Sequence, residues 1–360
     1  MTASGDRSGL ASFDVVRLNS ELFPVGGLEA DLYERFGLRP REVEANTPET
    51  IIPHVAECDA LFAVSVALPR EVIDSLRNCR LISRLGTGTD KIDVAGATER
   101  GIVVSNVPEF GVEDMADHTM GMILSLQRRL PWMHRRMLRG ESFAARSETL
   151  EIRRPGECVL GLVGFGASAR AVAARALPFG FRLLATRRNM RASTEEAERL
   201  RVRMVDLPTL LRESDYVSLH LPLDAGSYHL LDKEAIALMK PGAFLVNTSR
   251  GAIVDEPALA AALREGRLAG AGIDTFEGVE IFTRDERPPE HPLAGLDNVI
   301  LSPHVSGLSR TATRTCADAG VRNLVCALRG CLPPPGNIVN PSVVPRVPLA
   351  PHDPALFDGV

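Results

Sequence analysis

Short apolar runs alternate with segments of helical periodicity along most of the chain. In the first hundred residues the apolar runs are too short to form helices, and they are typical of strands buried on both faces of a sheet. Repeated strand–helix units indicate a parallel sheet with helices on both faces. We predict strands at residues 14–18, 60–66, 81–85 and 102–105, and helices at 28–36, 69–77 and 92–100.

The alternation resumes at residue 159 and predicts a second sheet of the same kind. Its strands are expected at 159–163, 182–185, 202–205, 216–219, 243–247, 271–274 and 299–302. Its helices are expected directly after residue 166 and at 207–212, 233–239 and 256–265. The predicted fold class is therefore α/β, with two doubly wound parallel sheets, and a chain of 360 residues is long enough for two domains.

Other segments stand apart from this alternation. Residues 112–130 are predicted to form a largely apolar helix buried between layers, and residues 309–328 are predicted to be helical. Residues 131–154 are rich in arginine and poor in core residues, so they are either a solvated connector or an arm that crosses to a second subunit. From residue 333 the sequence starts with prolines and shows no periodicity, which predicts an extended tail.

The composition excludes several classes of protein. Acidic residues outnumber basic residues by 46 to 41, so the chain lacks the excess of positive charge expected of a nucleic-acid-binding protein. The six cysteines show neither C-x-x-C pairs nor zinc-ligand spacing, which predicts unpaired thiols in a reducing compartment and no metal site. No apolar run is long enough to cross a membrane, and the N-terminal residues do not resemble a signal peptide. We therefore expect a cytoplasmic protein.

The stretch Gly164-Phe165-Gly166-Ala167-Ser168-Ala169 follows the first strand of the second sheet and precedes a helix. It matches the pattern G-x-G-x-x-G/A in the strand–turn–helix context that gives this pattern its meaning. The first glycine allows a tight turn, the second lets the backbone approach a pyrophosphate, and the alanine lets the helix pack closely on the strand. The helix would direct its unpaired N–H groups at the phosphates. We therefore predict that this turn binds a dinucleotide.

Polar residues follow three later strands directly, at the edge where an open parallel sheet binds its ligands. They are Thr248, Ser249, Arg250, Asp274 and His304. The planar guanidinium of Arg250 suits a substrate carboxylate, and His304 can exchange a proton near neutral pH, as the reduction of a ketone requires. Taken singly, the arginine could be a salt-bridge partner and the histidine a turn residue. Together these residues predict an active site.

At these residues the chain closely resembles the D-isomer-specific 2-hydroxyacid dehydrogenases, which include D-lactate, D-glycerate/hydroxypyruvate and D-3-phosphoglycerate dehydrogenases. The resemblance runs from about residue 81 to residue 307 and includes the glycine motif and the blocks LHLPL, MKPGAFLVNTSRGAIVDEPALAAAL, LAGAGIDTFE and DNVILSPHVSG. It implies a homodimer and a nicotinamide cofactor. It also implies a flavodoxin-like substrate domain of residues 1–106 and 308–336, an inserted Rossmann domain of residues 107–307 that binds the cofactor, and an extended tail of residues 337–360.

The resemblance also implies roles for individual residues. Arg250 would bind the substrate carboxylate and keto oxygen, His304 would be the acid/base, and the backbone N–H groups of residues 86–88 would bind the carboxylate. Substrate contacts are implied for Thr87, Gly88 and Asn106. Cofactor contacts are implied for Gly164, Phe165, Gly166, Ala167, Ser168, Thr119, Thr248, Ser249, Asp274, Ser306 and Gly307, with His220 and Pro222 from the LHLPL block.

The sequence departs from the family pattern at the acidic partner of the catalytic histidine. Without gaps, that position falls on Val279, which is flanked by Glu277 and Glu280. A one-residue bulge would bring Glu280 into place, so we predict Glu280 as the partner and keep Glu277 as the alternative. Without a carboxylate beside it, His304 would be less basic.

Two further departures concern the cofactor and the substrate. Arg187, followed by Arg188, replaces the acid that binds the adenosine ribose hydroxyls in the family. Unless both are merely surface arginines, this predicts a preference for NADP(H), with NAD(H) as the other possibility. Residues 65–68 lack the arginines with which the phosphoglycerate enzymes bind the substrate phosphate. We therefore expect a small, unphosphorylated or apolar 2-oxo acid as the substrate.

The predicted function is the NAD(P)H-dependent reduction of a 2-oxo acid to a D-2-hydroxy acid, and the reverse reaction. The alternative is a corepressor-like protein that senses a dinucleotide and contacts other proteins, because relatives of this fold act in that way. This alternative stays open because the acidic partner of His304 is not fixed by the sequence and because segment 131–154 is rich in arginine. We interpret the histidines other than His304 as structural or surface residues, of which His118 and His220 could lie near the cofactor.

Overall fold

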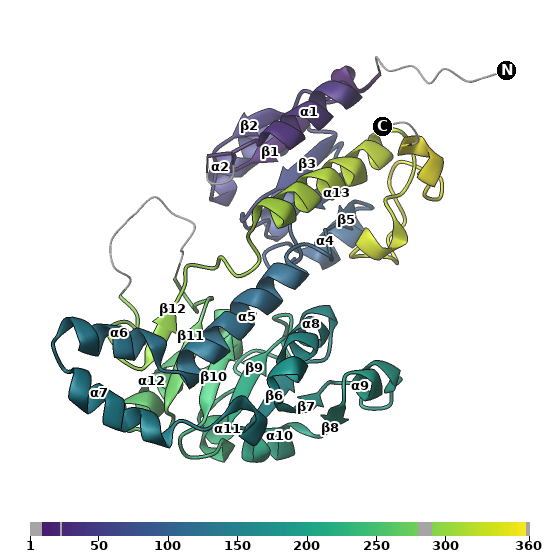
Figure 1. Ribbon diagram of the computed structural model, residues 1–360. Helices are drawn as coiled ribbons and strands as arrows, with labels where there is room; N and C mark the ends of the chain where they lie inside the picture. The colour runs from purple at the N-terminus through teal and green to yellow at the C-terminus, as the bar shows by residue number, and fades with distance from the viewer. Residues whose placement is uncertain (1–8, 22–23, 280–289, 358–360) are drawn as a thin grey trace. The chain divides into compact units, whose positions relative to one another are not determined.

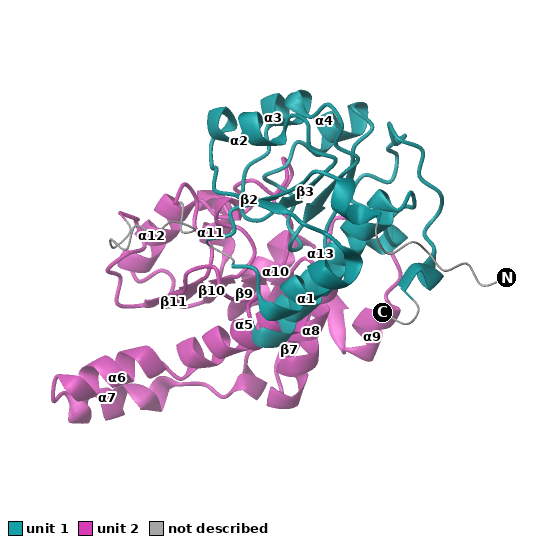
Figure 2. Cartoon of the chain, turned by 90° about the horizontal axis from the view of Figure 1, so that it is seen from above, with its two compact units in different colours: residues 1–110, 309–360 teal, residues 111–308 magenta. Residues whose placement is uncertain are grey.

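The computed structural model describes residues 9–21, 24–279 and 290–357, and the chain divides into two compact units (Figure 1). Unit 1 consists of residues 1–110 and 309–360, and unit 2 consists of residues 111–308 (Figure 2). Within the described residues each unit contains one sheet in which all neighbouring strands are parallel. The predicted α/β class with two parallel sheets is therefore confirmed.

The sheet of unit 1 has the strand order β2-β1-β3-β4-β5. Its strands are β1 (Val15–Leu18), β2 (Arg41–Val43), β3 (Ala60–Ala63), β4 (Leu81–Arg84) and β5 (Val103–Ser105). Its α-helices are α1 (Gly27–Phe36), α2 (Pro48–Val55), α3 (Arg70–Ser75), α4 (Val94–Glu99) and α13 (Arg310–Leu328). This is the strand order of flavodoxin-like folds, as the resemblance implied.

Both faces of the unit 1 sheet are buried, which explains why its strands read as continuous apolar runs. Successive side chains of a strand point to opposite faces. Accordingly, Leu61 and Ala63 of β3 belong to the core shared with α2 and α3, whereas Ala60 and Phe62 belong to the core shared with α1 and α13.

The C-terminal part of the chain completes unit 1. The hydroxyl of Ser83 in β4 donates to the carbonyl of Gly320 in α13 at 2.9 Å. The side-chain oxygen of Asn340 accepts the amide of Val104 in β5 at 2.8 Å, and the guanidinium of Arg346 donates to three backbone carbonyls between residues 76 and 100. Residues 333–357 are irregular apart from two short 3₁₀ turns, but these contacts fasten them to the unit.

The sheet of unit 2 has the strand order β12-β11-β10-β9-β6-β7-β8, which reverses between β6 and β9 in the manner of a Rossmann fold. Its strands are β6 (Val159–Val163), β7 (Arg182–Thr186), β8 (Val202–Met204), β9 (Tyr216–Leu219), β10 (Phe244–Asn247), β11 (Gly270–Ile273) and β12 (Val299–Leu301). Its α-helices are α5 (Val112–Gln127), α6 (Leu130–Leu138), α7 (Ser142–Glu148), α8 (Ala167–Ala176), α9 (Glu195–Arg199), α10 (Leu207–Glu213), α11 (Lys233–Leu238) and α12 (Glu256–Arg264).

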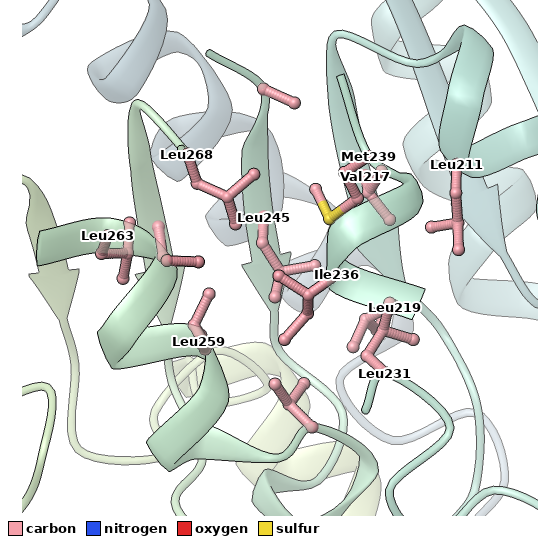
Figure 3. Packing of buried hydrophobic residues seen from close by; sticks show 14 of the residues in the cluster. Leu211, Val217, Leu219, Leu231, Ile236, Met239, Leu245, Leu259, Leu263 and Leu268 are labelled. Atoms are coloured by element: carbon pink, nitrogen blue, oxygen red, sulfur yellow. The ribbon is translucent and has the colours of Figure 1, made fainter. Parts of the chain in front are cut away.

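Two cores cover the two faces of this sheet. On one face, large aliphatic side chains of β9, β10, α11 and α12, among them Leu219, Leu245 and Leu259, pack together (Figure 3). On the other face, α8 contributes small residues, and Ala169 is fully buried in the same cluster as Leu160 of β6. The small side chain lets α8 lie close to β6, which is the role expected of this position in the glycine motif.

The sequence pattern missed β2, α2, α6, α7 and α9. The helix α2 was hidden by Pro48 at its start and Pro53 inside it.

The segment 131–154 is mostly helical: α6 and α7 lie side by side and form a helical hairpin (Figure 1). Arg136 of α6 pairs with Glu148 of α7 at 2.8 Å, so part of the positive charge in this segment is used within the hairpin. The segment is thus helical, and both interpretations of it, a solvated connector and an arm to a second subunit, stay predictions.

All six cysteines are buried and have free thiols, so the expectation of unpaired cysteines is confirmed. None of the helices in the described ranges combines the length and the apolar character of a membrane span.

The strand β9 leads directly into a buried histidine. His220 is 6% exposed, and its Nε2 atom lies 2.9 Å from the hydroxyl oxygen of Ser218. Its Nδ1 atom is buried and has no hydrogen-bond partner among the described residues. Burial lowers the pKa of His220 to about 4, because desolvation penalises the charged imidazolium form. The side chain is therefore neutral at physiological pH.

We expect His220 to make the protein sensitive to acid. Between pH 6.5 and about 4 the unfolded chain binds a proton at this residue that the folded chain does not bind. Above pH 6.5 His220 is neutral in both the folded and the unfolded chain, so its protonation does not affect the free energy of unfolding. Below pH 6.5 the free energy of unfolding falls by up to about 3 kcal/mol as the pH approaches 4. Urea unfolding at pH 7.5 and pH 4.5 should show a smaller acid-induced loss in His220→Gln than in the wild type. An equal loss would contradict this assignment.

Candidate functional site

The glycine motif forms the turn between β6 and α8. Gly164 has a φ of +98°, and a Cβ atom there would lie 2.2 Å from the carbonyl oxygen of His220, so no larger residue fits. Gly166 is exposed, and a Cβ atom there would meet nothing within 4 Å. One glycine of the motif thus packs against the protein, and the other faces open space.

The turn fits the pyrophosphate of a dinucleotide. The open space at Gly166 directly precedes the first turn of α8, where the N–H groups of Ala167 and Ser168 have no acceptor inside the helix. Phe165 between the two glycines is buried in the core and anchors the turn. Exposed amides at the start of a helix, with no Cβ atom in front of them, form a favourable site for a phosphate.

The two arginines after β7 have different surroundings. The amide of Gly164 donates to the carbonyl of Thr186 at 3.0 Å, so Arg187 begins beside the glycine turn. Its guanidinium donates to carbonyls of its own loop, and its Nε atom is buried without a partner in the described part of the chain. Arg188 is exposed and pairs with Asp224 at 2.8 Å. Arg187 is therefore the better candidate for a cofactor contact.

Three of the predicted cofactor residues fix the strand ends to one another. Thr119 of α5 and Thr248 after β10 are both buried, and their hydroxyl oxygens are 3.0 Å apart. The hydroxyl of Ser249 donates to the carbonyl of Leu219 at 2.7 Å and so joins the ends of β10 and β9. These hydroxyl groups make hydrogen bonds within the protein and support the edge of the sheet.

Two other predicted cofactor residues lie in turns. The carbonyl of Pro222 accepts the hydroxyl of Ser227 at 2.7 Å, which closes the turn after β9. Gly307 lies against the backbone of Gly111, where a Cβ atom would be only 2.6 Å from the Gly307 carbonyl oxygen.

Asp274 follows β11 and is completely buried. Its Oδ1 atom accepts the hydroxyl of Ser302 at 2.5 Å and the amide of Val305 at 3.0 Å, and its Oδ2 atom accepts the amide of Ser306 at 3.0 Å. The sequence placed Asp274 and Ser306 at the cofactor. The structure shows that the Asp274 carboxylate binds the turn at residues 302–306.

His304 lies in the turn that Asp274 holds. Its amide donates to the carbonyl of Asp274 at 2.8 Å, and the side chain is half-buried. Its φ is +54°, a conformation that costs a histidine about 1 kcal/mol and that persists where surrounding contacts impose it. His118 of α5 supports the turn from another side, because its Nε2 atom lies 3.0 Å from the hydroxyl oxygen of Ser302.

Arg250 follows β10, and its Nη1 atom donates to the carbonyl of Ser249 at 2.7 Å. The strands β10, β11 and β12 are adjacent and parallel, so Arg250, Asp274 and His304 follow strands that end at the same edge of the sheet. Neighbouring strands lie about 4.8 Å apart, which places the strand ends before Arg250 and His304 roughly 10 Å from each other. A small molecule can span that distance.

The structure distinguishes the two candidate acids for His304. The carboxylate of Glu277 lies 2.8 Å from the imidazole of His229, and the Glu277 amide donates to Glu256 at 3.1 Å. Glu277 is therefore engaged with a different histidine. Glu280 lies outside the described residues, and its pairing with His304 stays a prediction.

In unit 1, the loop after β4 presents backbone amides. The carbonyls of residues 86–88 accept, in order, the amide of Val107 at 3.0 Å, the side-chain amide of Asn106 at 2.7 Å and Nε of Arg84 at 3.0 Å. The hydroxyl of Thr87 donates to the carbonyl of Val107 at 3.1 Å. The N–H groups of residues 86–88 make no hydrogen bond to a described residue. This loop therefore suits an anion, and Asn106 orients it.

Ser302, His118 and His229 are site residues whose contacts the sequence reasoning did not predict. Ser302 follows β12 directly, so the rule that identified Arg250 and Asp274 could have identified it as well. No sequence signal points to His229, because its partner Glu277 lies 48 residues further along the chain.

Comparisons with known proteins identify the family of the chain. The family model described as "D-isomer specific 2-hydroxyacid dehydrogenase, NAD binding domain" matches residues 120–306. A glyoxylate reductase of Korarchaeum cryptofilum is 38% identical over 301 residues, which are 82% of this chain and 87% of that protein. A glyoxylate reductase of Thermococcus litoralis is 35% identical over 306 residues, which are 83% of this chain and 88% of that protein.

A solved structure shares the architecture of both units. The D-lactate dehydrogenase of Aquifex aeolicus, in complex with NAD and lactic acid, aligns with a TM-score of 0.81 and 27% identity, over 91% of this chain and 99% of that chain. With the match to the family model over half of the sequence and the identities to two curated relatives, this protein belongs to the D-isomer-specific 2-hydroxyacid dehydrogenase family.

Proposed function

We propose that the protein reduces a small 2-oxo acid to the D-2-hydroxy acid, and catalyses the reverse reaction, with a nicotinamide dinucleotide as cofactor. The observation that carries this proposal is the shared edge of the unit 2 sheet. The glycine turn, Arg250 and the turn of His304 all follow parallel strands of that sheet. The similarity to two proteins named glyoxylate reductases supports a substrate of this kind.

The side chains at this edge have the chemistry for the reaction. A bound reduced nicotinamide supplies the hydride that is added to the keto carbon. Arg250 binds the substrate carboxylate and polarises the keto oxygen through its planar guanidinium. His304 donates a proton to that oxygen as the negative charge develops on it, and accepts the proton in the oxidative direction. Glu280 stabilises the protonated imidazole of His304.

The residues of unit 1 favour a small, uncharged substrate side chain. The amides of residues 86–88 bind a carboxylate group of the substrate. The loop after β3 has the sequence Ser65-Val66-Ala67-Leu68, which contains no cation for a phosphate group. The proposed substrates are therefore unphosphorylated or apolar 2-oxo acids.

Replacement of His304 tests the chemistry. General acid–base catalysis contributes about 10²–10⁴ in rate, so we expect His304→Asn to lower kcat by a factor in this range. The dissociation constant of the reduced cofactor should not change, because the glycine turn remains intact. The measurement is the initial rate of reduced-cofactor oxidation with glyoxylate, hydroxypyruvate, pyruvate and branched 2-oxo acids.

The exposed His54 of α2 provides a matched control, and His54→Gln should turn over like the wild type. A kcat near the wild-type value in His304→Asn would remove this histidine from the mechanism. If the wild type bound the reduced cofactor but reduced none of these acids, a dinucleotide-sensing protein would be the better explanation.

NADP(H) is the cofactor that we propose as preferred over NAD(H). Arg187 stands where the family pattern has an acid, and a guanidinium attracts the 2′-phosphate that an acid would repel. Two observations support this assignment: the Nε atom of Arg187 has no hydrogen-bond partner among the described residues, and Arg187 lies next to the glycine turn.

We expect kcat/KM of the wild type to be at least about tenfold higher with NADPH than with NADH, as charge-assisted recognition of a phosphate implies. Arg187→Asp should reverse this preference. Arg188→Ala should change it much less, because Asp224 already binds that guanidinium. Initial rates with both cofactors measure the preference, and a wild-type enzyme that favoured NADH tenfold would refute the proposal.

The helical hairpin α6–α7 is the surface that we propose joins two copies of the chain into a homodimer. Phe143 and Leu138 are 88% and 76% exposed, and Leu130, Met137 and Leu150 of the same region are also exposed. A cluster of large apolar side chains on one projecting element is typical of an interface.

Charges placed in this cluster should separate the copies. We expect the double variant Leu138→Glu/Phe143→Glu to have the mass of a monomer by size-exclusion chromatography with light scattering, whereas the wild type has the mass of a dimer. Phe179→Glu, at an exposed phenylalanine after α8, is the control and should stay dimeric. A monomeric wild type would disprove the assignment.

A further inference from the structure

A hydrogen-bonded histidine–glutamate pair that the proposed mechanism does not use lies beside Arg250. The Nε2 atom of His229 is 2.8 Å from the Oε2 atom of Glu277, and the side chains are 31% and 28% exposed. His229 belongs to the loop after β9, Arg250 follows β10, and Glu277 follows β11. Because β10 lies between β9 and β11 in the sheet, the pair joins the loops on both sides of Arg250.

On the β9 side, residues 229–231 are hydrogen-bonded to the segment after Arg250. The amide of His229 donates to the carbonyl of Ala252 at 2.8 Å, and the amide of Leu231 donates to that of Ile253 at 3.0 Å. The φ of His229 is +46°, which is unfavourable for a residue other than glycine and indicates that the surrounding contacts impose it.

On the β11 side, the peptide between Phe276 and Glu277 packs directly on Gly251. A Cβ atom at Gly251 would lie only 2.0 Å from the carbonyl carbon of Phe276. The amide of Glu277 donates to Glu256, whose Oε2 atom also lies 2.5 Å from Nε2 of the buried His291. The backbone of Glu277 is therefore fixed, and its carboxylate reaches across to His229.

We propose that His229 and Glu277 are positioning residues that hold Arg250 in place for the substrate, an inference that rests on the proposed function. The hydrogen-bonded pair closes a clamp around residues 250–254, with one member on each side. Loss of the pair removes the side-chain link between the two loops, so the segment of Arg250 is held less firmly and its guanidinium can take other orientations. A shift of about 1 Å in a positioning group can cost on the order of 100-fold in rate, so a pair that acts through Arg250 can control turnover.

The surroundings of the pair support this arrangement. The ring of Tyr228 stacks on the ring of His229, with the ring centres 4.1 Å apart and the planes 11° from parallel. The negative charge of Glu277 raises the pKa of Tyr228, because it disfavours the phenolate form. Tyr228 therefore stays neutral and covers one face of His229. The other ionisable groups close to the pair are Asp255, Glu256 and His291.

Steady-state kinetics of His229→Asn and Glu277→Ala test the clamp. Asparagine tolerates the positive φ of residue 229 but is too short to reach Glu277. We expect kcat/KM for the best 2-oxo acid to fall about 10- to 100-fold in each variant, while the dissociation constant of the reduced cofactor, measured by fluorescence titration, stays unchanged. The double variant should be no worse than the single variants, because either substitution opens the same clamp.

A third variant separates a role through Arg250 from a general structural role. In an Arg250→Gln background, His229→Asn should cause no further loss of kcat/KM. The matched controls are His54→Gln, at an exposed histidine of α2, and Glu213→Gln, which breaks a surface pair with Arg203, and both should behave like the wild type.

Three outcomes would overturn the clamp: a full additional loss in the Arg250→Gln background, wild-type kcat/KM in both single variants, or a parallel loss of cofactor affinity. If Glu277→Ala does not fold, His229→Asn carries the test alone. Failure of the proposed function looks different, because the wild type then reduces no 2-oxo acid or Arg250→Gln turns over like the wild type.

Discussion

The buried carboxylate of Asp274 is the interaction on which the functional edge of unit 2 depends. A carboxylate without exposure to water is tolerated only when hydrogen bonds satisfy its oxygens, and here Ser302 and the amides of Val305 and Ser306 do so. The turn that carries His304 cannot move away without leaving an unpaired charge in the core. This constraint keeps the unfavourable backbone conformation of His304 in place. The hydrogen bonds of the Asp274 carboxylate thus fix the position of His304, the proposed proton donor.

Much of the fold could be predicted from the sequence because steric rules leave few choices. Strands buried on both faces must be largely apolar, so their ends are visible where Asn247, Asp274 or Ser302 interrupts an apolar run. The glycine motif is equally constrained, since Gly164 has no room for a side chain and Ala169 lies at the contact between helix and strand. Local backbone geometry restricts the residue types at these positions, so they can be predicted from the sequence around them.

The remaining features depend on partners that are distant in the sequence. Nothing near Asp274 indicates that its carboxylate accepts amides about thirty residues later instead of facing a ligand. The pairing of Glu277 with His229 is equally hidden, and a gapless alignment treats Glu277 only as a neighbour of the expected acid. The hairpin α6–α7 was missed because α6 buries none of its residues and the segment is rich in arginine, so the segment was interpreted as a connector or an arm and not as a pair of helices. The sequence thus failed to predict these features for two physical reasons: their partners are distant in the sequence, or their helices bury few residues.

Unit 1 is assembled from the two ends of the chain, and this has a consequence for its biosynthesis. One face of its sheet is covered partly by α13, where Val321 and Leu324 pack in the same cluster as Phe62. A ribosome delivers α13 only after all of unit 2, which is contiguous in the sequence. The apolar face of the strands between residues 15 and 105 therefore stays partly uncovered until α13 has been synthesised. Unit 1 can complete its core only after the whole of unit 2 has been made.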